Sequence, residues 1–233
     1  MKKTFAFLII IFTFVCASCD DGRIYEENVS LPEEGRVVKL TGLLSGAGNW
    51  SSGYTVVIAG FNDESDYAVI AKAVPAADTR EVVLSGISEE VTKLELCVIS
   101  RLRKRVVTFR TFDCPVTADT IRVEAGTLNV GMYAAIQDRL FNTTCANCHG
   151  ASTQAAAGLF LTEGKSHAAL VGQPSLKVPG ELLVEPGKAS RSVLYQALFT
   201  DLSAGWNYDH TKEVLSSEME DVLEDWIDDG AKE

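Results

Sequence analysis

Apolar and β-branched residues recur in short runs along the first half of the chain, and turn-forming residues separate the runs. Leu94, Leu96 and Val98 show the two-residue period of a strand. The runs cover residues 36–40, 54–59, 67–74, 81–84, 93–100, 106–112 and 120–124. Seven such runs within about a hundred residues predict an antiparallel β-sandwich.

The pattern changes after Gly126, where apolar residues take up helical spacing. Met132, Ile136 and Leu140 fit one helical face. Ser216 or Ser217 can cap a last amphipathic helix, and Glu220 is placed for a capping box if Ser217 is the cap. The sequence therefore predicts two domains. An all-β sandwich over 32–126, immunoglobulin- or fibronectin-like in architecture, precedes an all-α domain over 127–233.

The N-terminus has the features of an export signal over residues 1–18. Lys2 and Lys3 precede an apolar run, and small residues precede Cys19. This arrangement resembles the lipobox of bacterial lipoproteins, with Cys19 as the acylated first residue of the mature chain and 19–31 as a polar tether. Cys16 stands where leucine is usual, and simple cleavage with a free Cys19 is the alternative. The resemblance implies an exported protein anchored by lipid to a bacterial membrane, the outer one by preference, on either face.

The charge balance is acidic and argues against a nucleic-acid partner. The formal net charge is −11, and loss of Lys2 and Lys3 with the signal leaves −13. The one basic cluster spans residues 101–105. It reads either as a contact for an anionic lipid or acidic partner, or as the solvated tip of a hairpin.

Residues 145–150 read CANCHG and contain C-x-x-C-H, the attachment pattern of a c-type haem. On one helical turn, Cys145, Cys148 and His149 project to the same side. The two thiols can then bond the porphyrin vinyl groups, and His149 can bind the iron as proximal ligand. Gly150 can let the chain leave the turn with an unusual backbone angle. The sequence predicts one covalently attached haem c.

C-x-x-C also occurs in zinc sites and in dithiol redox motifs. A zinc site needs four ligands, and neither a second C-x-x-C nor an H-x₃₋₅-H follows in the sequence. A dithiol redox motif belongs with a thioredoxin-like βαβ pattern, which the chain does not show.

The second half also carries a family resemblance. Residues 131–233 resemble class I cytochrome c domains, and more narrowly the planctomycete-type domains of exported bacterial proteins. Besides C-x-x-C-H, stretches similar to that family's motifs follow in order: 158–161 for G-L-x-L, 182–187 and 192–195 for V-x-P-G and S-x-L-x, and 215–218 with 225–231 for L-S-x-E and W-I-x-x-G-A. The resemblance implies an all-α monohaem cytochrome c domain over a little under half of the chain. Residues 20–125 resemble no family.

The chain departs from that family at the second axial ligand of the iron. The family commonly has Met-Pro shortly before L-S-x-E, whereas residues 206–214 contain no methionine. His210 is the strong iron ligand in this window and is the favoured distal ligand. Met219 and His167 are the rivals, and an iron without a second protein ligand is the remaining alternative. Met219 falls on the apolar stripe of the last helix, where methionine is more often core.

These features favour a membrane-anchored electron carrier over a catalyst. The leading hypothesis is one-electron transfer to a redox partner protein that the sequence does not identify. The second is a surface binding module for a glycan or protein, in which the haem is structural or senses a gas or redox state. Trp50 and Tyr54 could serve such binding or belong to the core. A peroxidase-like enzyme is the third, and a single C-x-x-C-H makes a dihaem peroxidase improbable.

Overall fold

A computed structural model describes residues 35–116, 119–150, 155–213 and 216–233, and residues 34–233 form one compact unit. The expected signal at 1–18, the acylated Cys19 and the tether at 19–31 lie outside the described residues. In the part that is described, no helix has the length and apolar character needed to cross a membrane.

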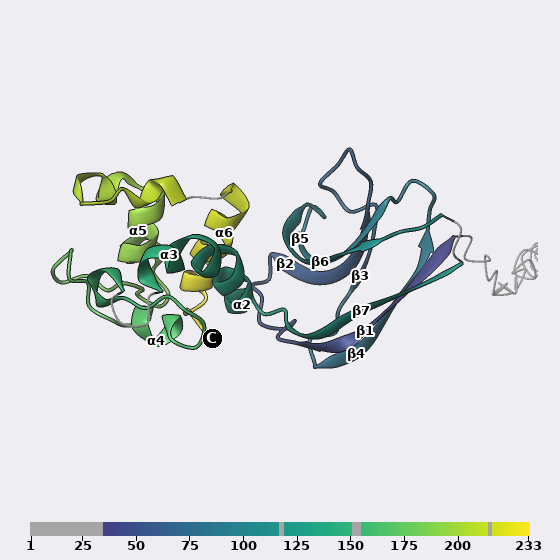
Figure 1. The fold of residues 1–233 in the computed structure, drawn as a ribbon, viewed down its shortest axis with the longest axis horizontal. Coiled ribbons are helices and arrows are strands. Elements are labelled where there is room, and N and C mark those ends of the chain that lie inside the picture. The colour runs from purple at the N-terminus through teal and green to yellow at the C-terminus, as the bar shows by residue number, and fades with distance from the viewer. Residues whose placement is uncertain (1–34, 117–118, 151–154, 214–215) are drawn as a thin grey trace, which may run out of the picture. The chain divides into compact units, whose positions relative to one another are not determined.

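Seven strands form two sheets, labelled in Figure 1. One sheet has the order β4-β1-β7 and the other β3-β2-β5-β6. The strands are β1 (Arg36–Ser45), β2 (Tyr54–Phe61), β3 (Ile70–Ala73), β4 (Thr79–Ile87), β5 (Lys93–Ser100), β6 (Arg105–Asp113) and β7 (Thr120–Asn129). Each lies at or beside one of the seven apolar runs in the sequence. The expected all-antiparallel pairing is wrong, because β1 pairs in parallel with β7 from Val37–Thr120 to Ser45–Asn129.

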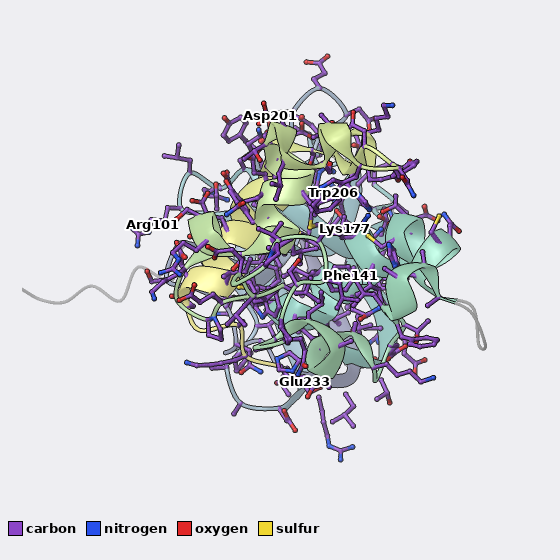
Figure 2. The ribbon with its side chains drawn as sticks, turned by 90° about the vertical axis from the view of Figure 1, so that its left-hand side faces the viewer. Arg101, Phe141, Lys177, Asp201, Trp206 and Glu233 are labelled. Carbon is purple, nitrogen blue, oxygen red and sulfur yellow. The ribbon has the colours of Figure 1, made fainter. Side chains whose placement is uncertain are left out.

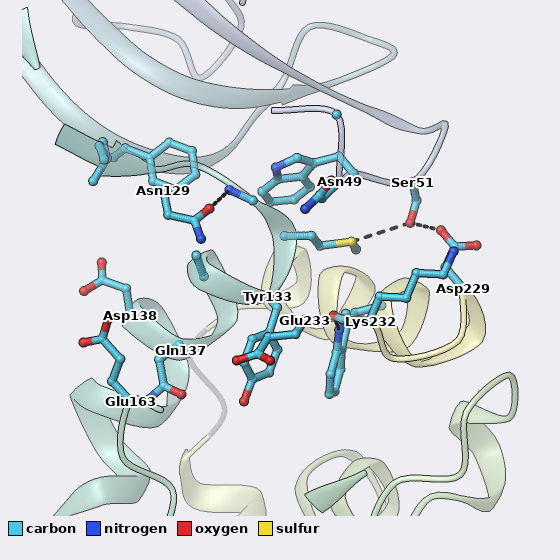
Figure 3. A pocket seen from close by; sticks show the side chains of 18 of the residues that line it. Asn49, Ser51, Asn129, Tyr133, Gln137, Asp138, Glu163, Asp229, Lys232 and Glu233 are labelled. Atoms are coloured by element: carbon cyan, nitrogen blue, oxygen red, sulfur yellow. Dashed lines mark hydrogen bonds between the residues drawn. The ribbon is translucent and has the colours of Figure 1, made fainter. Parts of the chain in front are cut away.

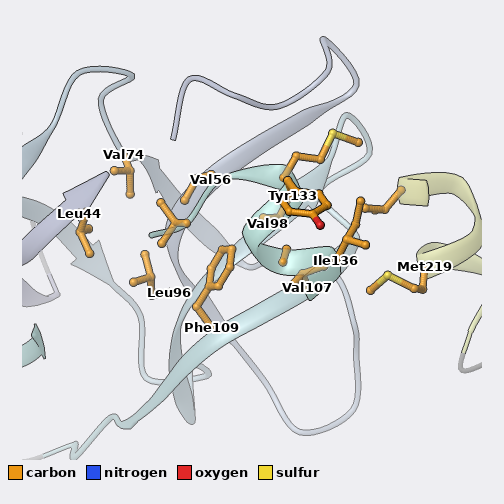
Figure 4. Close-up of a cluster of buried hydrophobic side chains, with 14 of the residues drawn as sticks. Leu44, Val56, Val74, Leu96, Val98, Val107, Phe109, Tyr133, Ile136 and Met219 are labelled. Carbon is orange, nitrogen blue, oxygen red and sulfur yellow. The ribbon is translucent and has the colours of Figure 1, made fainter. Parts of the chain in front are cut away.

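The central strand β5 is buried on both faces. Leu94, Leu96 and Val98 belong to the main apolar cluster between the sheets (Figure 4). Cys97 and Ile99 belong to a smaller cluster on the other face, together with residues of β2. A strand that is covered on both sides needs apolar residues at nearly every position, and this accounts for the composition of this run.

The second half consists of short helical pieces joined by turns. They are α2 (Met132–Ile136), the π-helical η2 (Gln137–Cys145), α3 (Ala146–His149), η3 (Ala156–Gly158), α4 (Ser166–Leu170), η4 (Ala189–Arg191), α5 (Val193–Phe199), η5 (Asp201–Gly205), η6 (His210–Glu213) and α6 (Ser217–Asp228). Figure 2 shows these pieces with their side chains, where Phe141 lies in the interior and Arg101 at the edge. Only α6, with 12 residues, reaches the length of an average helix.

The prediction of a separate all-α cytochrome c domain is wrong. The described chain is rich in strand, and its helices are short. Met132, Ile136 and Leu140 are buried as their spacing suggests, but they join the same apolar cluster as the inner faces of the sheets. Helical spacing identifies a buried face without fixing how long the helix is or which surface covers it. The strand and helical segments therefore share one core.

The basic cluster at 101–105 lies at the exposed turn between β5 and β6, as predicted for a hairpin tip, and its side chains also have partners within the chain. Arg103 donates to the Val69 carbonyl at 2.9 Å. Lys104 Nζ lies 2.5 Å from Glu218 Oε1 on α6, and this pairing lowers the pKa of Glu218 to about 2. Lys104 thus links the β5–β6 turn to the last helix.

Arg105 neutralises a buried carboxylate. Its Nη1 lies 2.6 Å from Oε1 of Glu95, whose side chain is 4% exposed, and Thr108 Oγ1 donates to Oε2 at 2.7 Å. Arg105→Met should lower the free energy of unfolding by about 3 kcal/mol, since the carboxylate then stays buried without its cation. Urea unfolding followed by circular dichroism measures the change.

Two further variants test the cause of that loss. Arg110→Met removes an arginine of the same strand that donates only to its neighbour's carbonyl, so its effect should stay within about 0.5 kcal/mol. Adding Glu95→Gln to Arg105→Met should recover much of the stability. A double variant as unstable as Arg105→Met would show that packing, and not the unpaired charge, causes the loss.

Candidate functional site

The two motif cysteines lie on one helical stretch, because η2 runs into α3 with helical backbone at Cys145 and Ala146. Cys145 is half-buried and packs against the main cluster, whereas Cys148 is exposed. Burial raises the pKa of the Cys145 thiol, which keeps it protonated at neutral pH. The Cys145 side chain is therefore more buried than that of Cys148, one turn further along.

Gly150 ends this helix for a steric reason and not through the expected unusual backbone angle. Its φ of −121° is ordinary for any residue. A Cβ at this position would lie 2.3 Å from the carbonyl oxygen of Ala146, a clash with backbone that cannot move away. Glycine is therefore the residue that fits this close to the Ala146 carbonyl.

His149 has one ring nitrogen already engaged. Its Nδ1 lies 3.0 Å from the carbonyl oxygen of Ala156, and its own carbonyl accepts from Leu161 N–H at 2.8 Å. A carbonyl only accepts, so this bond requires the proton on Nδ1 and leaves the lone pair on Nε2. Metal-binding histidines are commonly oriented in this way by a backbone carbonyl.

His210 opens the short helix η6, 61 positions further along the chain. The ring edges of Trp206 and Tyr208 flank it, with centroids 5.8 Å and 5.3 Å from its own (Trp206 is labelled in Figure 2). Within the described residues, its buried Nδ1 has no partner at hydrogen-bonding geometry. Burial, and then the nearby His149, lower the pKa of His210, so the ring is neutral at pH 7.

The structure places the two imidazoles near each other. The ring centroids of His149 and His210 are 6.3 Å apart, and the ring planes differ by 29°. This distance is too long for stacking contact. It is compatible with two imidazoles that would bind one metal through nitrogens at facing ring edges, because each bond would be about 2 Å and the ring radii would supply the rest.

The rival ligands lie elsewhere. Met219 is 7% exposed and belongs to the apolar core on α6. His167 Nε2 is bonded to the Ala231 carbonyl at 2.8 Å, and its ring lies against Tyr133 and Trp226. Of the three candidates for the distal ligand, only His210 lies near His149.

A haem needs at most two iron ligands from the protein, and the residues present fit this requirement. Across the described ranges, no group of three or more His, Cys, Asp or Glu side chains is placed to hold a metal ion by itself. The porphyrin supplies four nitrogens to its iron, so two axial imidazoles complete the coordination. His149 and His210 would supply these two nitrogens, and Cys145 and Cys148 would supply the attachment points.

A cavity lies away from these residues. It has a volume of about 850 Å³ and is lined by the 48–52 loop, the end of β7, α2 and the end of α6, with the Ser51–Asp229 hydrogen bond at its rim (Figure 3). Trp50 lines it, and its Nε1 donates to the Val130 carbonyl at 2.7 Å. Tyr54 instead donates to Asp225 at 2.8 Å. Trp50 ties the 48–52 loop to the residue between β7 and α2, and Tyr54 ties β2 to α6. No pattern in the sequence indicates this cavity, because segments that are far apart in the chain form its walls.

Comparison of the chain with protein-family models, with curated proteins and with solved structures gives no match. The functional argument therefore rests on the motif and on the geometry around it.

Proposed function

We propose that the chain carries one c-type haem, attached through Cys145 and Cys148 and held axially by His149 and His210, and that it transfers single electrons between partner proteins. The observation that carries this proposal is the imidazole pair at 6.3 Å beside the two thiols. The similarity of residues 131–233 to planctomycete-type cytochrome c motifs supports the cofactor. It does not extend to an all-α fold.

The residues around the proposed haem site suit a protein that carries electrons. Bound haem would supply a one-electron iron couple. Attachment needs no oxidant, because each thiol S–H adds across a vinyl double bond. The Ala156 carbonyl orients His149, and Trp206 and Tyr208 limit the rotation of the His210 ring. If His149 and His210 both bound the iron, no position would stay open for a substrate. This arrangement favours electron transfer over catalysis.

Absorption spectra of the purified holoprotein test the proposal. The oxidised and reduced forms should both be low-spin, a redox titration should fit one electron, and added carbon monoxide should change little. Ready binding of carbon monoxide by the unaltered protein would point to an open site, and hence to gas sensing or peroxide chemistry. If the protein contained no haem after expression together with a haem-attachment system, the proposal that it binds haem would be wrong.

We further propose that Cys19 anchors the exported chain in a bacterial membrane, because small residues precede it and two acidic residues follow. Mass analysis of the mature N-terminus should show an acylated Cys19, and Cys19→Ala should release the protein from the membrane fraction. A mature chain that starts elsewhere without an acyl group would instead indicate a freely diffusing exported protein.

A further inference from the structure

A serine with no exposed surface lies next to the candidate distal ligand. Ser203, on η5, is 0% exposed. Its Oγ donates to the carbonyl of Ala197 at 2.8 Å and accepts from the backbone N–H of His210 at 2.9 Å. Burying a hydroxyl costs free energy unless it is hydrogen-bonded, and here it bonds in both directions. The Ser203 side chain therefore connects the backbone of α5 to the backbone of η6.

Both backbone groups need this partner. Ala197 lies near the end of α5, where a helix leaves carbonyls without intrahelical donors. His210 begins η6, where the N–H groups have no acceptor within the helix. α5 is fixed in turn, because Val193 and Leu198 are buried. Ser203 thus joins the start of the His210 loop to a helix that the core holds in place.

The loop is also held on the other side of His210. The Asp209 carboxylate accepts from the backbone N–H of Thr211 at 3.1 Å and from its hydroxyl at 2.7 Å. This contact shapes the first turn of η6 but stays within the loop. Ser203 is the contact that ties the backbone of the histidine itself to α5.

We propose that Ser203 is a positioning residue, which holds the backbone of His210 so that its imidazole lies opposite His149. This inference rests on the proposed haem and on His210 as its distal ligand. Without the hydroxyl, the His210 N–H and the Ala197 carbonyl lose a buried partner, and the loop gains other conformations. Some chains have His210 in the binding position and others do not. We expect the ratio of the first population to the second to fall about tenfold.

Carbon monoxide binding to the reduced holoprotein measures this fraction, because carbon monoxide competes with His210 for the iron. Ser203→Ala should raise the apparent affinity for carbon monoxide about tenfold, while covalent haem content stays unchanged. Added free imidazole should restore a low-spin ferric spectrum. Ser203→Cys keeps the volume and a weak S–H donor, so its affinity should lie between those of Ser203→Ala and the unaltered protein.

Ser192 supplies a matched control. It is also 0% exposed, and its Oγ accepts from Glu185 N–H at 2.9 Å and donates to the Lys188 carbonyl at 3.0 Å. Ser192→Ala therefore removes a similar pair of buried hydrogen bonds without touching His210. Its affinity for carbon monoxide should match that of the unaltered protein.

The outcomes separate this inference from the proposed function. Equal carbon monoxide affinities in Ser203→Ala and the unaltered protein, with His210→Ala binding tightly, would overturn the role of Ser203 and leave His210 as ligand. Equal increases in Ser203→Ala and Ser192→Ala would show a general loss of stability, and would also overturn it. Tight binding of carbon monoxide by the unaltered protein would overturn both the assignment of His210 as distal ligand and the role of Ser203.

Discussion

Replacing both Cys145 and Cys148 with serine should yield protein whose haem is removed completely by acid–acetone extraction, whereas the unaltered protein keeps all of it. Each thioether needs one thiol, so the double variant has no covalent link left. Each single variant should retain one link and a weaker haem stain on a denaturing gel. This is the largest effect that we expect from any substitution in the chain.

The fold should survive these changes. Cys148 is exposed and Cys145 is half-buried, and serine is close to cysteine in volume. The free energy of unfolding of the Cys148→Ser apoprotein should therefore change by less than about 0.5 kcal/mol.

The chain offers its own control for this experiment, because Cys97 and Cys114 are free thiols buried in apolar clusters. Cys97→Ala and Cys114→Ala should keep the full haem stain, although both remove a buried sulfur. Haem that stays with the denatured Cys145→Ser/Cys148→Ser chain would contradict the attachment we propose.

The positions of the strands could be read from the sequence because their signals are local. Leu94, Leu96 and Val98 show their period within five residues, and all three are buried in the main cluster. The partner of β1 could not be read in this way. Its parallel pairing with β7 joins Val37 to Thr120, and nothing within either run encodes which distant strand it meets.

The wrong prediction of an all-α domain over 127–233 has the same cause, because a local pattern does not encode which distant segment it contacts. The apolar faces of α2 and η2 are visible in the sequence, but the surface that covers them is not. A face of three or four buried residues fits equally well against other helices or against a sheet. Ile136 and Leu140 lie in the same cluster as the sheet residues, so the segment has no separate core to define an all-α domain.

In the candidate site, too, local sequence patterns could be recognised, whereas contacts between distant residues could not. The spacing of Cys145, Cys148 and His149 is local and could be recognised. His210 was singled out by its position ahead of residues 215–218, and its distance of 6.3 Å from His149 is information from the structure. The Ala156 carbonyl bonds the His149 ring and Ser203 bonds the His210 backbone, and both are small residues that carry no pattern in the sequence.

His210→Ala should convert the ferric iron from low-spin to high-spin and raise the affinity of the reduced protein for carbon monoxide more than about 100-fold. Changes to residues that only support a metal ligand typically cost 10- to 100-fold in affinity, and loss of the ligand itself should exceed that. Haem should stay covalently attached, because Cys145 and Cys148 are intact. Absorption spectra and carbon monoxide titration give both quantities on the same sample.

Two variants decide whether His210 acts as a ligand or is simply a loop histidine. His167→Ala removes an imidazole whose Nε2 is held by the Ala231 carbonyl, and Met219→Leu replaces a thioether in the core by a side chain of similar volume. Both should leave the spectrum and the carbon monoxide affinity unchanged. If Met219→Leu opened the iron and His210→Ala did not, α6 would have to turn its buried methionine towards His149. The imidazole pair would then have no part in binding haem. Because Met219 is enclosed by the core and His210 already lies near His149, we expect the histidine to fill the sixth position.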